Sequence, residues 1–203
     1  SPHDKLPTSL IRDDRWMSVT ESRDFFRQVK FKLNWRPYQR RVLVQFDQLI
    51  RDRCFHVVAA PGAGKTILGL EAIRRIGRSA LILTPTLGVR DQWIHRFTHM
   101  FELPDSPPPV STNLLQPELL TVATYQNLHA CHRRHKIDVV RRQLSRAGVE
   151  TLVLDEAHHL RHEWWQTLFE LKKYFKDLFV ISLTATPPYD VSQIEWNRYM
   201  ALC

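Results

Sequence analysis

The residues best suited to chemistry form two groups, and Asp155 lies 90 positions after Lys65. The first group is the glycine-rich turn Pro61-Gly-Ala-Gly-Lys-Thr66, whose glycines let successive backbone N–H groups point inward at a phosphate. Lys65 supplies a positive charge there, and the Thr66 hydroxyl is a ligand for Mg²⁺. The second group is Asp155 and Glu156, two carboxylates that can hold Mg²⁺ and polarise an attacking water. Together the groups predict phosphoryl transfer from a nucleoside triphosphate.

Each group also has a plainer interpretation. A glycine-rich turn can be purely structural, and an Asp-Glu pair can cap a helix. The strict phosphate-loop pattern G-x-x-x-x-G-K-[ST] also requires glycine where Ala59 stands. The context favours the phosphate loop, because an apolar run precedes the turn and a helix-like stretch follows it. We therefore predict phosphate binding by Pro61, Gly62, Ala63, Gly64, Lys65 and Thr66, and metal binding by Thr66 and Asp155.

The elements that must position these residues alternate along the chain. Short runs that are apolar on both faces predict strands over Phe55–Ala60, Ala80–Thr84, Leu119–Thr124, Thr151–Asp155 and Phe179–Thr184. Helical spacing of apolar residues predicts helices over Tyr38–Ile50, Lys65–Ile76, Gly88–Met100, Ile137–Ala147 and Leu160–Tyr174. This alternation predicts an α/β fold with a parallel sheet. Ligands bind at the carboxyl ends of such strands, so Lys65 and Asp155 are expected to converge.

Two further segments bound the predicted domain. Residues 1–34 form a polar lead-in with one weakly helical patch over Glu21–Val29, and residues 35–203 form the domain itself. The stretch Leu103–Glu118 carries five prolines, which predict a surface loop with room for one short strand.

Composition sets the class of protein. The chain has 203 residues, of which 43% are apolar and 25% charged, as in an ordinary globular domain and unlike a disordered chain. A formal net charge of +8 fits a polyanion as partner. No apolar run approaches the ~18 residues of a membrane span, and the first residues lack the apolar core of a signal peptide. We expect a soluble domain with no membrane partner, located in the cytoplasm or elsewhere inside the cell.

Six segments, in their order along the chain, resemble motifs of the superfamily two helicases and translocases. The segments are Arg36-Pro-Tyr-Gln39, Ala59–Thr66, Thr84-Pro-Thr86 with Gln92-Trp93, Thr121–Gln126, Asp155-Glu-Ala-His158 and Leu183-Thr-Ala-Thr-Pro187. The resemblance covers almost the whole chain and implies a P-loop NTPase with a RecA-like sheet, helices on both of its faces, and ATP and Mg²⁺ as cofactors. It also implies a second RecA-like domain, absent from residues 1–203, without which hydrolysis is expected to be nearly lost.

The same resemblance implies roles for single residues. Catalysis would use Lys65, Asp155 and Glu156, with Glu156 activating the water. Adenine would be bound by Arg36 and Gln39. The nucleotide site would be coupled to a nucleic-acid cleft by His158, Thr184 and Thr186. Nucleic acid would be contacted by Pro85, Thr86 and Thr124.

The choice of nucleic acid depends on small departures within these motifs. Thr184-Ala-Thr186 stands where DEAD-box and DEAH-type RNA helicases have Ser-Ala-Thr, and the Arg-Pro-Tyr-Gln form resembles a DNA-directed branch. That branch includes helicases of the XPB and RadD kind and the motor subunits of restriction enzymes. We therefore predict an ATP-dependent DNA helicase or translocase, favouring DNA over RNA. The alternatives are an RNA helicase and an ATP-responsive clamp that grips nucleic acid without translocation.

The densest basic stretch, Arg133–Arg146, has six Lys and Arg residues and one acidic residue. Both phosphate contact and a simply solvated helix face explain it. The histidines nearby are spaced irregularly, which does not favour zinc. Trp93, Trp164 and Trp165 are predicted to be packing anchors rather than base-stacking platforms.

Overall fold

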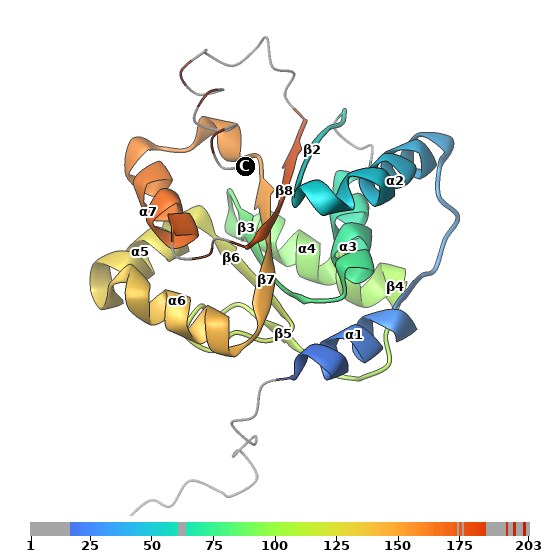
Figure 1. Cartoon of the computed structure of the whole chain (residues 1–203), viewed down its shortest axis with the longest axis horizontal. Coiled ribbons are helices and arrows are strands. Elements are labelled where there is room, and N and C mark those ends of the chain that lie inside the picture. Colours follow the sequence, from blue (N-terminus) through green and yellow to red (C-terminus); the bar gives the residue numbers. More distant parts are fainter. Residues whose placement is uncertain are drawn as a thin grey trace, which may run out of the picture.

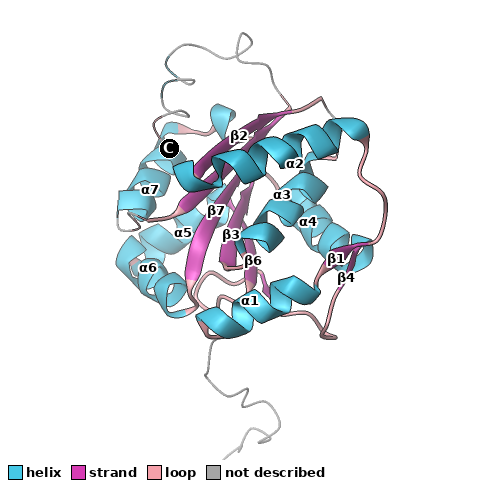
Figure 2. Ribbon diagram, turned by 45° about the vertical axis from the view of Figure 1, so that its right-hand side comes forward, coloured by secondary structure: helices cyan, strands magenta, loops and turns pink. Residues whose placement is uncertain are grey.

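Six parallel strands form the central sheet of this computed structural model, which describes residues 17–60, 64–173, 175, 177–185, 194, 197 and 201. Their order across the sheet is β2-β8-β7-β3-β6-β5 (Figures 1 and 2). The strands are β2 (Cys54–Val58), β3 (Ser79–Thr84), β5 (Val110–Ser111), β6 (Leu120–Thr124), β7 (Val149–Asp155) and β8 (Phe179–Thr184). The predicted α/β fold with a parallel sheet is confirmed.

Helices cover both faces of this sheet. The helices are α1 (Val19–Gln28), α2 (Pro37–Leu49), α3 (Lys65–Ile76), α4 (Leu87–Met100), α5 (Tyr125–His135), α6 (Ile137–Arg146) and α7 (His162–Lys173). In Figure 1, α1 to α4 lie to one side of the sheet and α5 to α7 to the other. Two short 3₁₀ turns follow α2 and β7, over Ile50–Asp52 and Ala157–His159.

Strand β3 shows why the strands are apolar without interruption. All six of its residues are buried. Ala80 and Ile82 belong to the core beneath α3 and α4, whereas Leu81 and Leu83 belong to the core beneath α5 to α7. Since successive side chains of a strand point to opposite faces, a strand covered by helices on both faces must be apolar at every position.

One α-helix and two short strands were not predicted. Helix α5 is rich in His and Arg, and among its residues only Tyr125 and Leu128 are buried, so its apolar stripe is too thin to recognise. A two-stranded antiparallel pair joins β1 (Lys30–Phe31) to β4 (Phe101–Glu102). Strands of two residues are too short to show any period in the sequence. The short strand allowed for in the proline-rich loop is β5.

Part of the predicted lead-in packs with the domain. Helix α1 begins with a capping box in which the Ser18 hydroxyl accepts from the Glu21 N–H and the Glu21 carboxylate accepts from the Ser18 N–H. Its residues Phe25 and Phe26 are buried in the same core as α3 and α4. The domain boundary placed at residue 35 stays a prediction.

Because the strands are parallel, their carboxyl ends share one edge of the sheet. Val58 at the end of β2 pairs with Thr184 of β8, Asp155 of β7 pairs with Leu183, and Thr84 of β3 pairs with Thr124 of β6. Most of the predicted site residues end these strands or belong to the segments that follow them in sequence, whereas Arg36 and Gln39 lie at the start of α2. None of the described helices is long and apolar enough to cross a bilayer.

Candidate nucleotide and nucleic-acid site

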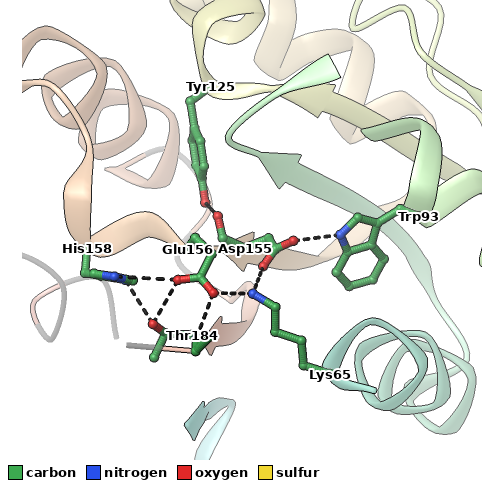
Figure 3. Close-up of polar contacts among 8 residues, drawn as sticks. Lys65, Trp93, Tyr125, Asp155, Glu156, His158 and Thr184 are labelled. Carbon is green, nitrogen blue, oxygen red and sulfur yellow. Dashed lines mark hydrogen bonds and ion pairs between the residues drawn. The ribbon is translucent and has the colours of Figure 1, made fainter. Parts of the chain in front are cut away.

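Lys65 joins the two predicted groups of chemical residues. It is the first residue of α3, directly after Gly64, whose left-handed φ of 79° is one that glycine adopts freely. The Lys65 ammonium donates to Oδ1 of Asp155 at 2.9 Å and to Oε1 of Glu156 (Figure 3). The expected convergence of Lys65 and Asp155 is therefore present. The remaining predicted phosphate-loop residues Pro61, Gly62 and Ala63 lie outside the described residues.

The charges in this cluster stabilise one another. Burial by itself would lower the pKa of Lys65, but attraction and hydrogen bonds from Asp155 and Glu156 outweigh it and raise that pKa. Burial by itself would raise the pKa of Glu156, but bonds from Lys65, the Ala185 N–H and the Thr184 hydroxyl outweigh it and lower that pKa. At neutral pH the lysine is charged and Glu156 is a carboxylate, the form that can accept a proton from water.

The backbone of Glu156 turns its carboxylate back toward the end of β8. Its φ of 53° and ψ of 44° lie in the left-handed region, which costs an L-residue roughly 1–2 kcal/mol. Three bonds hold it there. The Glu156 N–H donates to the Leu183 carbonyl at 2.9 Å, and its carboxylate accepts from the Ala185 N–H at 2.7 Å and from the Thr184 hydroxyl at 3.0 Å. The surroundings thus fix the direction of this carboxylate.

Two of the three predicted coupling residues meet at the same carboxylate. His158 is 1% exposed, and its Nδ1 lies 3.1 Å from the Thr184 hydroxyl. Its Nε2 lies 3.5 Å from Oε2 of Glu156 (Figure 3). The segment Asp155-Glu-Ala-His158 and the end of β8 are therefore linked through a buried histidine. The third predicted coupling residue, Thr186, lies outside the described residues.

Asp155 has two further partners that sequence reasoning missed. The indole N–H of Trp93 donates to Oδ2 of Asp155 at 2.9 Å, and the Tyr125 hydroxyl donates to the Asp155 backbone carbonyl at 3.0 Å (Figure 3). Trp93 was predicted to be a packing anchor, and it is indeed buried, but it also binds the candidate metal-holding carboxylate. A usable signal existed, since a buried Trp or Tyr usually directs its polar atom at a partner.

Of the predicted adenine-binding pair, Gln39 lies beside Gly64 of the predicted phosphate loop. Gln39 is 4% exposed, its Oε1 accepts from the Arg36 backbone N–H at 3.0 Å, and Arg36 itself is exposed. A Cβ at Gly64 would lie only 2.6 Å from Nε2 of Gln39, so the amide nitrogen is directed at the loop. The Gln39 amide oxygen already accepts from the Arg36 backbone N–H. To donate and accept at adenine at the same time, the Gln39 amide would have to give up that hydrogen bond. Adenine binding by this pair stays a prediction.

The predicted nucleic-acid residues lie at the carboxyl ends of β3 and β6. Thr86 is exposed and caps α4 by accepting from the Val89 N–H at 3.2 Å. Thr124 is 6% exposed and caps α5 by accepting from the Asn127 N–H at 3.0 Å. Pro85 is half-buried between the two elements that it joins. Because the Thr124 hydroxyl is buried in its cap, a phosphate there would meet the start of α5 rather than this hydroxyl.

The basic stretch begins on an open groove between α5 and α7. The groove has a volume of about 660 Å³ and is lined by Gln126, His129, Arg133, Arg134, Arg161 and Trp164, among others. The Arg161 guanidinium lies 5.2 Å from the centre of the Trp164 ring. Arg133 and Arg134 are exposed, so both interpretations of this stretch, phosphate contact and a solvated face, fit its place in the fold.

Comparison with known families decides which proteins this chain is related to. The model of the type III restriction enzyme res subunit, ResIII, matches residues 32–189. The chain belongs to the ResIII family. This membership confirms the resemblance to superfamily two motors and their RecA-like first domain.

Two curated proteins are similar to this ResIII chain. "Putative DNA 3'-5' helicase Rad25" of Halobacterium salinarum is 27% identical over 178 residues, which are 87% of this chain and 27% of that protein. "DNA 3'-5' translocase XPB2" of Sulfurisphaera tokodaii is 25% identical over 165 residues, 81% of this chain and 34% of that protein. The ResIII chain thus spans between a quarter and about a third of the length of these relatives.

Two solved structures share the fold. The helicase domain of Hef from Pyrococcus furiosus superposes with a TM-score of 0.60 at 21% identity, over 83% of this chain and 36% of that one. The UvsW helicase of bacteriophage T4 gives a TM-score of 0.61 at 14% identity, over 91% of this chain and 66% of that one. At these identities they establish the RecA-like fold of the ResIII domain and no more.

The residues of this ResIII domain fit magnesium held together with a nucleotide. No group of three or more His, Cys, Asp or Glu side chains forms a metal cage among the described residues. Mg²⁺ commonly takes one or two carboxylates and completes its shell with water and substrate phosphates. Asp155 offers a carboxylate that already binds one cation, and Thr66, half-buried at the second position of α3, offers a hydroxyl.

Proposed function

We propose that this ResIII domain is the ATP-binding half of an ATP-dependent DNA helicase or translocase. The observation that carries the proposal is the bridge that Lys65 makes between Asp155 and Glu156 at the carboxyl edge of the sheet. A phosphate-loop lysine and a pair of acidic side chains that converge there are parts required for nucleoside triphosphate hydrolysis. On this proposal residues 35–203 form the first RecA-like domain, and the natural protein carries a second.

The contacts of each residue in the cluster suit it to one role in ATP hydrolysis. Lys65 would leave the carboxylates for the nucleotide phosphates, since phosphate oxygens can replace Asp155 and Glu156 as acceptors of its ion pairs and hydrogen bonds. Thr66 and Asp155 would hold Mg²⁺, which would supply positive charge to neutralise the nucleotide phosphates. The Glu156 carboxylate, once released from Lys65, would accept the proton of the attacking water. Its bonds to Ala185 and Thr184 would keep it aimed during that exchange.

Two observations bear on the nucleic acid, and only the first of them distinguishes DNA from RNA. The names of the two curated relatives describe a DNA 3'-5' helicase and a DNA 3'-5' translocase. The chain carries a net charge of +8, which favours a polyanion. The contacts to nucleic acid at Pro85, Thr86 and Thr124, and the intracellular location, belong to the same proposal.

The test is phosphate release by the natural full-length protein with ATP and Mg²⁺. Single-stranded DNA, duplex DNA and RNA of equal length are added in separate reactions. We expect DNA to stimulate release well above the rate without nucleic acid, and RNA to stimulate it less. Equal or greater stimulation by RNA would identify an RNA motor instead. Binding of DNA without ATP turnover would identify a clamp.

The groove between α5 and α7 gives a second expected result. Neutralising Arg133 and Arg134 together as Arg133→Ala/Arg134→Ala should weaken DNA binding equally for unrelated sequences. For each phosphate that the protein no longer neutralises, the slope of log affinity against log salt should become shallower by about 0.7–0.9. The measurement is DNA affinity across a salt series by fluorescence anisotropy.

The matched control is Arg23→Ala/Arg27→Ala, which removes two exposed arginines from α1 on the opposite face. This control should keep the wild-type slope. A slope unchanged in the Arg133/Arg134 variant would show that the basic stretch is only a solvated helix face.

A further inference from the structure

Three polar atoms of Asp155 are bonded to three different helices. Its Oδ1 accepts from Lys65 on α3, its Oδ2 accepts from the Trp93 indole on α4, and its backbone carbonyl accepts from the Tyr125 hydroxyl on α5 (Figure 3). Of the three donors, only Lys65 belongs to the predicted phosphate loop. The other two come from the helices that start at the proposed nucleic-acid contacts.

The two aromatic donors are close in sequence to those contacts. Helix α4 is capped by Thr86, and Trp93 lies seven residues, or about two turns, further along it. Helix α5 is capped by Thr124, and Tyr125 is its first residue. A shift of either helix start would be transmitted along rigid backbone to the donor atom, because a helix moves as a unit on this length scale.

The donors are also held too tightly to move independently of their helices. Trp93 is 0% exposed and Tyr125 is 1% exposed. A Cβ added at Gly69 of α3 would lie 2.6 Å from Cη2 of Trp93 and 2.9 Å from Cδ1 of Leu183, so the indole fills the space between α3 and β8. Asp155 is itself 1% exposed, so water cannot readily replace a donor that moves away.

We propose that Trp93 and Tyr125 are positioning residues that transmit nucleic-acid binding at α4 and α5 to the metal-holding carboxylate of Asp155. This inference rests on the proposed function, because it requires nucleic acid at the starts of these helices. The route is separate from the predicted one through His158 and Thr184, which acts on Glu156. Two sites linked in this way change each other's affinity by the same factor.

The experiment removes each donor and leaves an aromatic ring in its place. Trp93→Phe deletes the indole N–H, and Tyr125→Phe deletes only a hydroxyl. In the natural full-length protein, the affinity for a non-hydrolysed ATP analogue with Mg²⁺ is measured with and without single-stranded DNA. The ratio of these two affinities is the coupling factor, which for linked sites is typically about 5–150. We expect each variant to lower the factor by up to about tenfold, toward 1, with analogue affinity without DNA nearly unchanged.

The matched control is Trp165→Phe. Trp165 is as buried as Trp93, at 1% exposed, but its indole nitrogen has no hydrogen-bond partner in the described part of the chain. The control variant makes the same change in volume and should keep the wild-type coupling factor. Tyr125→Phe, which leaves no cavity of comparable size, keeps the test valid if Trp93→Phe folds poorly.

The outcomes separate this inference from the function on which it rests. A wild-type factor above 1 that both variants retain would overturn the inference and leave the proposed function standing. An equal fall of the factor in Trp165→Phe would show that volume, and not the bond to Asp155, matters, and would also overturn it. A wild-type factor of 1 would overturn the inference, and DNA-stimulated phosphate release would then decide separately whether the proposed function stands.

Discussion

Glu156→Gln should reduce ATP hydrolysis by about 10²–10⁴-fold while ATP binding remains within a few-fold of wild type. The amide oxygen can still accept from the Ala185 N–H, and the NH₂ that replaces the other oxygen can donate to the Thr184 hydroxyl, which also accepts, so the local structure should persist. It has lost the negative charge that makes the carboxylate a proton acceptor. It has also lost its ion pair with Lys65, which frees the lysine for phosphate.

Single-turnover hydrolysis and equilibrium ATP binding, measured on the natural full-length protein, separate the two effects. The control is Glu170→Gln, which makes the same chemical change at an exposed position of α7. This control should hydrolyse ATP at the wild-type rate. If Glu156→Gln did the same, Glu156 would have no part in activating water, and the left-handed turn that aims it would be only structural.

Lys65→Met should weaken binding of ATP by about 10–150-fold, the effect of losing one charge-assisted hydrogen bond. Methionine keeps much of the aliphatic stem, so α3 should still begin at this position. The variant also leaves Asp155 and Glu156 side by side without their shared cation, and the pKa of Glu156, which Lys65 helps to lower, should rise.

Titration with a fluorescent ATP analogue measures the affinity, and ADP serves as a comparison. The loss should be smaller for ADP, because Lys65 is expected at the β- and γ-phosphates. Lys173→Met, an exposed lysine near the end of α7, is the control and should bind as wild type does. Unchanged ATP affinity in Lys65→Met would contradict the assignment of the phosphate loop.

The sheet and the nucleotide cluster were predictable because their sequence signals are strong. A strand such as β3, buried on both faces, must be apolar throughout, and this distinguishes it from a half-exposed strand. Once the strands are known to be parallel, Lys65 and Asp155 must meet at their shared edge, although 90 positions separate them. These conclusions need only periodicity and topology.

The missed features depend on side-chain direction, which periodicity does not report. Trp93 was correctly expected to be buried, but only its orientation shows that the indole N–H reaches Asp155. Thr124 was expected at a strand end, but only the structure shows that its hydroxyl is occupied by the helix cap. Helix α5 was missed for another reason, since its many exposed His and Arg residues hide a buried stripe of two residues.

The order of the strands has a consequence for how the chain folds. β2, the strand before the phosphate loop, is the first strand of the large sheet in sequence, and its neighbour β8 is the last. Cys54 pairs with Val180, which is 126 positions later (180 − 54). Pairing at such separation is slow, since a long loop must close before any contact forms. During synthesis, the edge of β2 that pairs with β8 would stay unpaired until β8 has left the ribosome. The candidate nucleotide site would therefore be assembled last, and until then it would be the part of the fold most prone to aggregation.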